Sequence, residues 1–259
     1  MSVEQAPMAR GAVPRGATDE KSAGIAVQSM FNQIAPRYDL LNHILSCNID
    51  RMWWNRVAKT FSPVLQKHDA RILDLCCGTG DMALALWRRR ERLIAGNFPA
   101  SSIVAADFAH SMLTRAARKF AGKRIVPAEA DALRLPFAQD QFDLVVSAFG
   151  FRNLANYDSG LHEIYRVLRP GGQLGILEFS EPDGLMGLLY GFYFRRILPV
   201  VGTVIGGVKG PYSYLPASVS RFPTSREMQE QMAAAGFIDV HWAAYTGGIA
   251  GLYSAARPL

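Results

Sequence analysis

The sequence predicts an open α/β sheet of seven strands, mostly parallel, with helices on both faces. Short apolar runs alternate with stretches of helical spacing between residues 72 and 236, an order typical of a parallel sheet with helical connections. The runs are continuously apolar, as strands are when both faces of a sheet are covered. Two further strand-like segments, joined by a turn that contains Gly-Gly, predict an antiparallel hairpin at one edge of the sheet.

The elements are expected in a regular order along the chain. Strands are expected at 72–75, 103–106, 125–128, 142–146, 174–179, 240–245 and 252–255, and helices at 81–90, 111–120, 158–168 and 226–236. Ser111 is a suitable N-cap for the second helix, and Thr224 or Ser225 for the last. The Pro-Gly-Gly sequence at 170–172 is expected to break the chain before the fifth strand. Because right-handed crossovers bring the carboxyl ends of parallel strands to one edge, the turns after the first, second and fourth strands should lie together.

The chain divides into three parts by pattern. Residues 1–23 are rich in Ala, Gly and Pro, and we interpret them as a disordered tail. Apolar residues recur at roughly helical spacing over 24–66, which predicts a helical N-terminal segment ahead of a main domain at 67–259. The first residues contain no apolar stretch of signal-peptide length, so we expect a cytoplasmic protein.

The composition excludes several classes of protein. Of the 259 residues, 49% are hydrophobic and 19% are charged, which provides a large core and excludes wholesale disorder. The net charge of +6 suits an anionic partner, but no basic run is interleaved with aromatic residues, so we expect no nucleic acid. The three cysteines have no zinc or disulfide-framework spacing, and no paired His or carboxylate triad predicts a metal.

A glycine-containing turn follows the first strand. In the segment Ile72–Asp81, Gly78 and Gly80 lack a Cβ and would let a ligand approach the backbone. The N–H groups of the next helix would favour a carboxylate or phosphate there. This signal is weakly specific, because it also satisfies a loose dinucleotide-binding fingerprint.

Acidic residues follow the second and third strands. Asp107 could accept hydrogen bonds from both hydroxyls of a ribose, or it could cap the following helix. Since Ser111 can fill the capping role, we favour the ribose interpretation. Asp131, followed by Ala132, could accept an adenine amino hydrogen. A short-chain dehydrogenase would need a Tyr-x-x-x-Lys pair, which the sequence lacks, so a reductase is disfavoured.

Longer motifs resemble a known family. Four segments resemble the successive motifs of class I S-adenosylmethionine methyltransferases: Ile72–Asp81, Ile103–Met112, Phe142–Gly150 and Leu168–Leu177. Four others resemble the quinone-biosynthesis C-methyltransferases: Met30–Asn42, Ser147–Asn153, Leu177–Ser180 and Tyr212–Ser218. The resemblance extends from about residue 28 to residue 258. It implies a Rossmann-like class I methyltransferase fold.

The resemblance also implies a reaction. S-adenosylmethionine is the expected cofactor, and the expected acceptor is the ring carbon of a polyprenylated quinol. Demethylmenaquinol is the first choice, and the ubiquinone precursor 2-methoxy-6-polyprenyl-1,4-benzoquinol is the alternative. A methyltransferase with another small apolar acceptor, a reductase, and a scaffold without activity are the remaining readings.

The resemblance assigns roles to individual residues. It implies cofactor contacts at these positions: Gly78, Thr79, Gly80, Asp107, Asp131, Ala132 and Ser147. Candidate groups at the quinol end are Tyr38, Asp39, Arg152 and Asn153. Arg152 could stabilise a developing phenolate and Asn153 could orient a hydroxyl; alternatively, Arg152 forms an ion pair with a local acid and Tyr38 is a core aromatic. We expect Cys76 and Cys77 to pack under the cofactor rather than react.

An apolar insert is expected at 183–222. Its two apolar runs, 184–194 and 197–208, are each too short to span a bilayer and flank Arg195 and Arg196. We interpret the insert as a cover for the site that receives the isoprenoid tail, with the two arginines facing anionic lipid headgroups in a reversible membrane contact. The sequence leaves the oligomeric state open, with a homodimer as one candidate.

Overall fold

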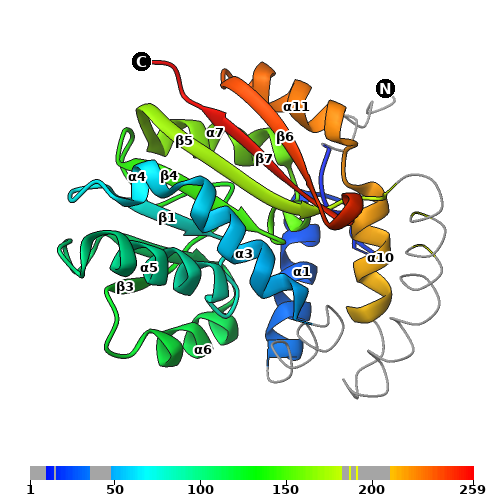
Figure 1. The fold of residues 1–259 in the computed structure, drawn as a ribbon. Helices are drawn as coiled ribbons and strands as arrows, with labels where there is room; N and C mark the ends of the chain where they lie inside the picture. The colour runs from blue at the N-terminus through cyan, green and yellow to red at the C-terminus, as the bar shows by residue number, and fades with distance from the viewer. Residues whose placement is uncertain (1–9, 15, 36–47, 183–186, 188–190, 192–210) are drawn as a thin grey trace.

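The protein is described by a computed structural model that covers residues 10–14, 16–35, 48–182, 187, 191 and 211–259 (Figure 1). Its strands are β1 (Ile72–Leu75), β2 (Ile103–Asp107), β3 (Ile125–Glu129), β4 (Phe142–Ala148), β5 (Leu168–Phe179), β6 (Ile238–Tyr245) and β7 (Ala250–Ala256). Its helices are α1 (Glu20–Ile34), α3 (Ile49–Thr60), α4 (Ser62–Leu65), α5 (Asp81–Ile94), α6 (His110–Phe120), α7 (Tyr157–Val167), α10 (Pro211–Arg221) and α11 (Ser225–Ala234), with short 3-10 turns η2 (Phe151–Asn153) and η4 (Thr246–Gly248).

The seven strands form one mostly parallel sheet, which confirms the predicted fold class. The strand order is β3-β2-β1-β4-β5-β7-β6. The pairs from β3 to β5 are parallel, whereas β7 pairs antiparallel with both β5 and β6. The closing hairpin therefore lies at one edge, as expected from its turn sequence.

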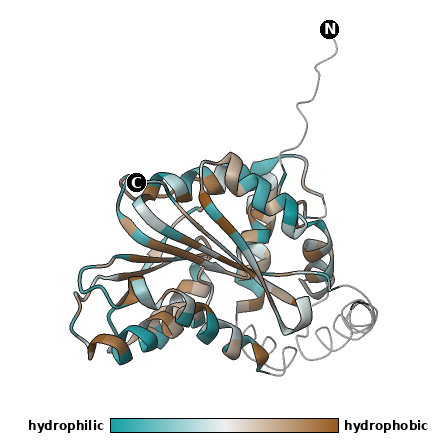
Figure 2. Cartoon of the chain, turned by 45° about the horizontal axis from the view of Figure 1, so that its top comes forward, coloured by the Kyte–Doolittle hydropathy of each residue, from teal (hydrophilic) through white to brown (hydrophobic). Residues whose placement is uncertain are grey.

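Apolar side chains pack on both faces of the sheet. On β1 the side chains alternate: Ile72 packs in a cluster with α3, α4, α5 and α6, and Leu73 in a cluster with α7 and α11. Hydrophobic residues are frequent within the strands, whereas hydrophobic and hydrophilic residues alternate along the helices (Figure 2). Burying each large apolar side chain stabilises the fold by about 1.5–3 kcal/mol. This double-sided packing fixes the central strand, and with it the loop that leaves its carboxyl end.

The strand order reverses at β1, which has β2 on one side and β4 on the other. In open α/β sheets such a reversal opens a crevice at the carboxyl ends of the strands, where ligands bind. Helix α1 lies across this end of the sheet (Figure 1). The Gln28 side-chain amide donates to the Phe108 carbonyl at 2.6 Å, and Asn32 Oδ1 accepts from Ser111 N at 3.0 Å.

Two expectations about helix starts have different outcomes. Thr224 caps α11 as expected, in a capping box with Glu227. The expectation that Ser111 caps α6 is wrong, because α6 begins at His110 and its N-cap is Ala109. Ser111 lies inside the helix, where its backbone N–H is satisfied by Asn32 from α1. A tertiary contact has therefore replaced the local cap.

The structure also differs from the expected tail. Helix α1 begins at Glu20, capped by Asp19. Farther upstream, Ala12 is buried, and its backbone N donates to the Leu154 carbonyl at 2.7 Å. Residues 10–14 are thus tied to the domain, and helix α1 crosses the boundary expected near residue 23. The proposed division at residue 66 stays a prediction.

The break expected at 170–172 is a bulge within a longer strand. β5 begins at Leu168, pairing with Phe142, and the register then shifts so that Leu144 pairs with Gln173. The Pro-Gly-Gly sequence therefore interrupts the ladder without ending the strand. Tyr38, Asp39, Arg195 and Arg196 lie outside the described residues, as does most of the expected insert; its last part forms α10.

Candidate active site at the carboxyl ends of the strands

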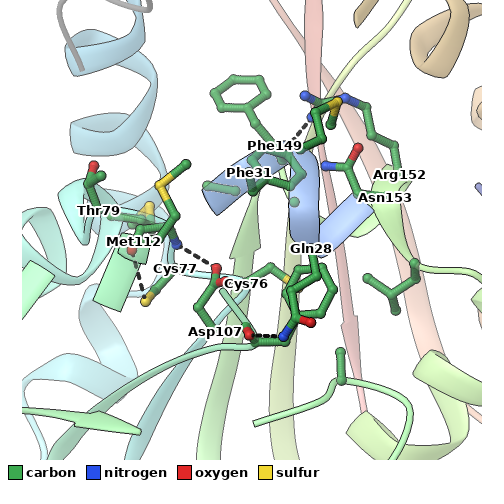
Figure 3. Close-up of a pocket in the computed structure, with 18 of the residues that line it drawn as sticks. Gln28, Phe31, Cys76, Cys77, Thr79, Asp107, Met112, Phe149, Arg152 and Asn153 are labelled. Carbon is green, nitrogen blue, oxygen red and sulfur yellow. Dashed lines mark hydrogen bonds between the residues drawn. The ribbon is translucent and has the colours of Figure 1, made fainter. Parts of the chain in front are cut away.

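A cavity of about 960 Å³ lies at the carboxyl ends of β1, β2 and β4. It is bounded by α1 and α3, by the loops after these strands, and by α10 (Figure 3). Of the described residues predicted to form the site, the following line it: Gly78, Thr79, Asp107, Asp131, Ala132, Arg152 and Asn153. Gly80 and Ser147 do not. The sequence therefore brought most of its candidates to one place.

The loop after β1 uses its two glycines differently. Gly78 has φ +55° and lines the cavity. Gly80 has φ +87°, and a Cβ built on it would lie 2.3 Å from the Phe120 ring of α6. The left-handed conformation and this close approach both require glycine at position 80. Gly80 thus serves the packing of α5 against α6, whereas the sequence suggested ligand access.

The Asp107 carboxylate joins two loops. Its Oδ2 accepts from Gly78 N and its Oδ1 from Ala109 N, both at 2.8 Å. It therefore bonds to the N-cap residue of α6, close to the helix-capping role that the sequence offered as the alternative for Asp107. Each carboxylate oxygen can accept a second hydrogen bond, so these contacts leave acceptor capacity for a ligand. Burial raises the pKa of Asp107 from 3.8 to about 6.

Further polar contacts hold the cavity lining near Asp107, which we call the acidic end. Lys119 of α6 bonds to Asp81 Oδ1 at 3.0 Å and to Thr79 Oγ1 at 3.1 Å, which holds the loop after β1. Asp131 Oδ1 accepts from Leu133 N at 2.9 Å. Gln28 also lines the cavity, and sequence reasoning assigned it no role. In the sequence, Gln28 stands out only as a polar residue within the pattern of apolar residues that predicts α1.

Asp74 on β1 adds a buried acid to the lining. Asp74 lines the cavity and is fully buried, and neither of its carboxylate oxygens has a hydrogen-bond partner in the described part of the chain. The Ala83 backbone N–H opposes part of the effect of burial on the pKa of this carboxyl. Burial raises the pKa of Asp74 well above its usual value, and the charges of Asp107 and Asp81 add to this. A cationic ligand group would satisfy this carboxyl.

Two cysteines lie beside the acids. Cys76 and Cys77 line the cavity, and burial raises the pKa of both thiols well above the usual value, reinforced by Asp107 and Asp74. Such thiols are poor nucleophiles. Ser147 is fully buried and lies near Cys76, and its neighbour Ala148 reaches the cavity instead. A side-chain contact from Ser147 to a cofactor therefore has no support in this geometry.

The other end of the cavity contains a buried ion pair. Arg152 Nη1 lies 2.9 Å from Glu178 Oε2, and Arg152 N donates to Glu178 Oε1 at 3.0 Å. Arg152 Nε also donates to Ser218 Oγ of α10 at 3.3 Å. The side chains of Arg152 and Glu178 are 6% and 0% exposed. The alternative role, an ion pair with a local acid, is thus present; Glu178, an acid within an apolar strand, was the missed signal.

Aromatic rings form a wall between the two ends. Phe149 stacks on Phe179 with 4.4 Å between ring centroids, and Trp53 packs on both. Trp53 Nε1 is held by Thr246 Oγ1 at 2.8 Å. All three rings line the cavity, and Figure 3 shows Phe149 among the lining residues. Phe149 has φ +59°, which is strained for a non-glycine residue. The wall suits a flat apolar ligand.

Comparisons with known proteins agree with this fold. The sheet and its crevice define a class I methyltransferase fold. A solved structure from Thermotoga maritima, described as a SAM-dependent methyltransferase, has a TM-score of 0.60, is 14% identical, and covers 89% of this chain and 99% of its own. The chain belongs to the ubiE/COQ5 methyltransferase family, whose model matches residues 17–257. The resemblance seen in the sequence is confirmed.

Two curated relatives illustrate the similarity. The chain is 47% identical over 232 residues to the demethylmenaquinone methyltransferase of Thermus thermophilus, covering 88% of this chain and 100% of that protein. It is 40% identical over 241 residues to the ubiquinone/menaquinone biosynthesis C-methyltransferase UbiE of Geobacter sulfurreducens, covering 91% and 90%. The chain is therefore similar to full-length methyltransferases over nearly their whole length.

The pKa of Asp107 predicts how stability depends on pH. Between 3.8 and about 6 the folded chain retains a proton at Asp107 that the unfolded chain has lost. The free energy of unfolding should therefore fall as pH rises through this window. In denaturant titrations, the free energy of unfolding of the wild type should fall between pH 4 and pH 6.5 by up to about 3 kcal/mol more than that of Asp107→Asn. Parallel curves for the two proteins would contradict the assignment.

Proposed function

We propose that this protein transfers a methyl group from S-adenosylmethionine to a ring carbon of demethylmenaquinol, giving menaquinol. The observation that carries the proposal is one cavity that combines an acidic, polar end with an aromatic, apolar wall. Family membership and the similarity to named demethylmenaquinone methyltransferases support it. The acceptor ring would lie against the aromatic wall, within reach of Arg152 and Asn153.

The residues at the acidic end fit the proposed cofactor. S-adenosylmethionine carries a cationic sulfonium and amino group and supplies an electrophilic methyl group. The buried, unpartnered carboxyl of Asp74 suits the cationic part, and the remaining acceptor capacity of Asp107 suits the ribose hydroxyls. Asp131 and Ala132 would contact the adenine, and Gly78 and Thr79 would contact the rest of the cofactor.

The chain's own residues would orient and polarise the acceptor. A quinol carbon becomes nucleophilic when a neighbouring hydroxyl is ionised or donates strongly. With the ring hydroxyl ionised, the negative charge of the acceptor and the positive charge of a bound methyl donor would neutralise one another during transfer, and the hydrogen displaced from the ring carbon would leave as a proton that restores the hydroxyl. Because charge is neutralised in this step, the aromatic wall favours it by excluding water, and fixed positioning of the ring adds to the rate.

Methyl transfer is tested directly by mass spectrometry. The protein is incubated anaerobically with S-adenosylmethionine and either demethylmenaquinol or the ubiquinone precursor. We expect a product from demethylmenaquinol that carries one more methyl group.

The Asp107→Ala variant should bind S-adenosylmethionine at least about tenfold more weakly, because two hydrogen bonds to a charged group are lost.

A matched control is Asp143→Ala, whose carboxylate pairs with Arg169 at 3.0 Å and does not line the cavity. This variant should retain wild-type affinity for S-adenosylmethionine. No methylated product from either quinol, despite cofactor binding by the wild type, would refute the proposed function.

The role of Arg152 can be separated from its structural pairing. Arg152→Met leaves Glu178 buried without this partner and should lower the free energy of unfolding by about 3–5 kcal/mol. Adding Glu178→Gln should restore most of that stability, since no isolated charge remains. If Arg152 acts on the quinol, turnover stays low in the double variant while cofactor affinity is unchanged. Recovery of both stability and turnover would reduce Arg152 to a structural role.

We further propose that the protein works in the cytoplasm and contacts an anionic membrane surface to collect its acceptor. Ile25 and Met52 are 58% and 55% exposed, and Ile25 lies at the cavity. Among the described residues, no helix has the length and apolar character needed to cross a bilayer. The net charge of +6 would favour anionic headgroups.

Sedimentation with liposomes tests the membrane contact. At low salt the protein should pellet with vesicles that contain anionic lipid and remain in solution with zwitterionic vesicles. Ile25→Asp combined with Met52→Asp should reduce the fraction of protein bound to vesicles, because each substitution replaces an exposed apolar side chain with a negatively charged one. The absence of binding to anionic vesicles at low salt would refute the contact.

A further inference from the structure

Two buried polar atoms at the α10 end of the cavity lack partners. Tyr214 of α10 and Asn153 of η2 both line the cavity. The Tyr214 hydroxyl and Asn153 Oδ1 are shielded from solvent and have no hydrogen-bond partner within the part of the chain that the structure describes. Leaving such a group unsatisfied destabilises the folded protein. Buried polar groups are almost always paired in native proteins, so the pair of exceptions points to a ligand.

The two residues are held at the same place. Asn153 follows Arg152, which donates to Ser218 of α10, one helical turn after Tyr214. The ion pair with Glu178 fixes Arg152 in turn. Helix α10 contacts η2, and burial raises the pKa of Tyr214, so its hydroxyl keeps its proton. The Asn153 amide lies beside Arg152 and is turned toward the middle of the cavity (Figure 3).

The two atoms have complementary chemistry. A tyrosine hydroxyl that keeps its proton can donate, whereas the Asn153 oxygen can only accept. A single ligand group that satisfies both must accept one hydrogen bond and donate another. A phenolic hydroxyl does this, but a quinone carbonyl cannot donate. This requirement distinguishes the reduced from the oxidised form of the same ring.

We propose that Tyr214 and Asn153 together bind one ring hydroxyl of the acceptor and thereby select the quinol over the quinone. This inference rests on the proposed function, because it names the group recognised at the acceptor end of that site. A bound quinone would satisfy Tyr214 but leave Asn153 Oδ1 unpaired. The expected preference for quinol is about tenfold or more, since 1.4 kcal/mol corresponds to a factor of ten.

Equilibrium binding of a short-chain 1,4-naphthoquinol and of its quinone tests the proposal. Measurements are made anaerobically with S-adenosylhomocysteine present. Wild type should bind the quinol at least about tenfold more tightly than the quinone. Tyr214→Phe should weaken both ligands by a similar factor, because hydroxyl and carbonyl both accept from Tyr214. Asn153→Leu should weaken only the quinol and bring the affinity ratio toward one.

Control variants separate recognition from folding. Tyr165→Phe removes a hydroxyl from a ring that packs on Phe237, away from the residues that line the cavity, and should leave both affinities unchanged. Thermal unfolding and S-adenosylhomocysteine affinity report whether each variant is folded. If Asn153→Leu is unstable, Asn153→Ala removes the same oxygen without added bulk and should show the same loss of preference.

The outcomes distinguish this inference from the function on which it rests. If the wild type methylates the quinol but the folded Asn153 variants keep the wild-type affinity ratio, the inference is wrong and the proposed function stands. Equal weakening of quinol and quinone by the Asn153 substitution would also overturn it. If the wild type binds S-adenosylhomocysteine but neither quinol nor quinone, both are overturned.

Discussion

The site depends on one carboxylate that ties two loops together. Asp107 accepts a hydrogen bond from Gly78 on one side and from Ala109 on the other. These loops follow β1 and β2, so the bridge sets the spacing of the polar end of the cavity. It places an acid where burial opposes ionisation, a cost that a ligand with hydroxyl donors would offset. The electrostatics at this point are thus coupled to binding.

The opposite end is built on a different balance of charge. Arg152 and Glu178 neutralise one another and connect η2, β5 and α10. The cavity therefore changes from an acidic end to one whose net charge is small, with aromatic rings between them. A cationic donor and an aromatic acceptor would each meet the surface that suits them. This asymmetry explains how one crevice at the strand reversal can bring two unlike molecules into contact.

Much of the fold could be predicted from the sequence, because buried parallel strands leave continuous apolar runs. The predicted cofactor residues came from the ends of those strands, so the topology brought most of them to one cavity. The errors lay where distant contacts replace local rules. Ser111 looked like a cap, but Asn32 from α1 satisfies its N–H. The sequence also did not show that Phe120 from α6 packs against Gly80, and its cofactor contact stays a prediction.

Other features depend on tertiary partners that no local pattern identifies. The sequence offered an ion pair for Arg152 without naming Glu178, which lies on another strand. Tyr214 belonged to a recognised motif, yet its place beside η2 follows from how α10 packs. The continuation of β5 through its Pro-Gly-Gly segment reflects pairing with β4 and β7. Three-dimensional contacts, rather than residue type, settle each of these points.

We infer an arrangement in which the cofactor's sugar lies at Asp107 while the acceptor ring lies at the far end of the same cavity. A crystal structure with S-adenosylhomocysteine and a short-chain naphthoquinol bound would test it most directly. We expect ribose hydroxyls within hydrogen-bond distance of Asp107 and a quinol ring against Phe149, between the cofactor sulfur and Asn153. A ribose bound away from Asp107, or a quinol bound outside the cavity, would contradict it.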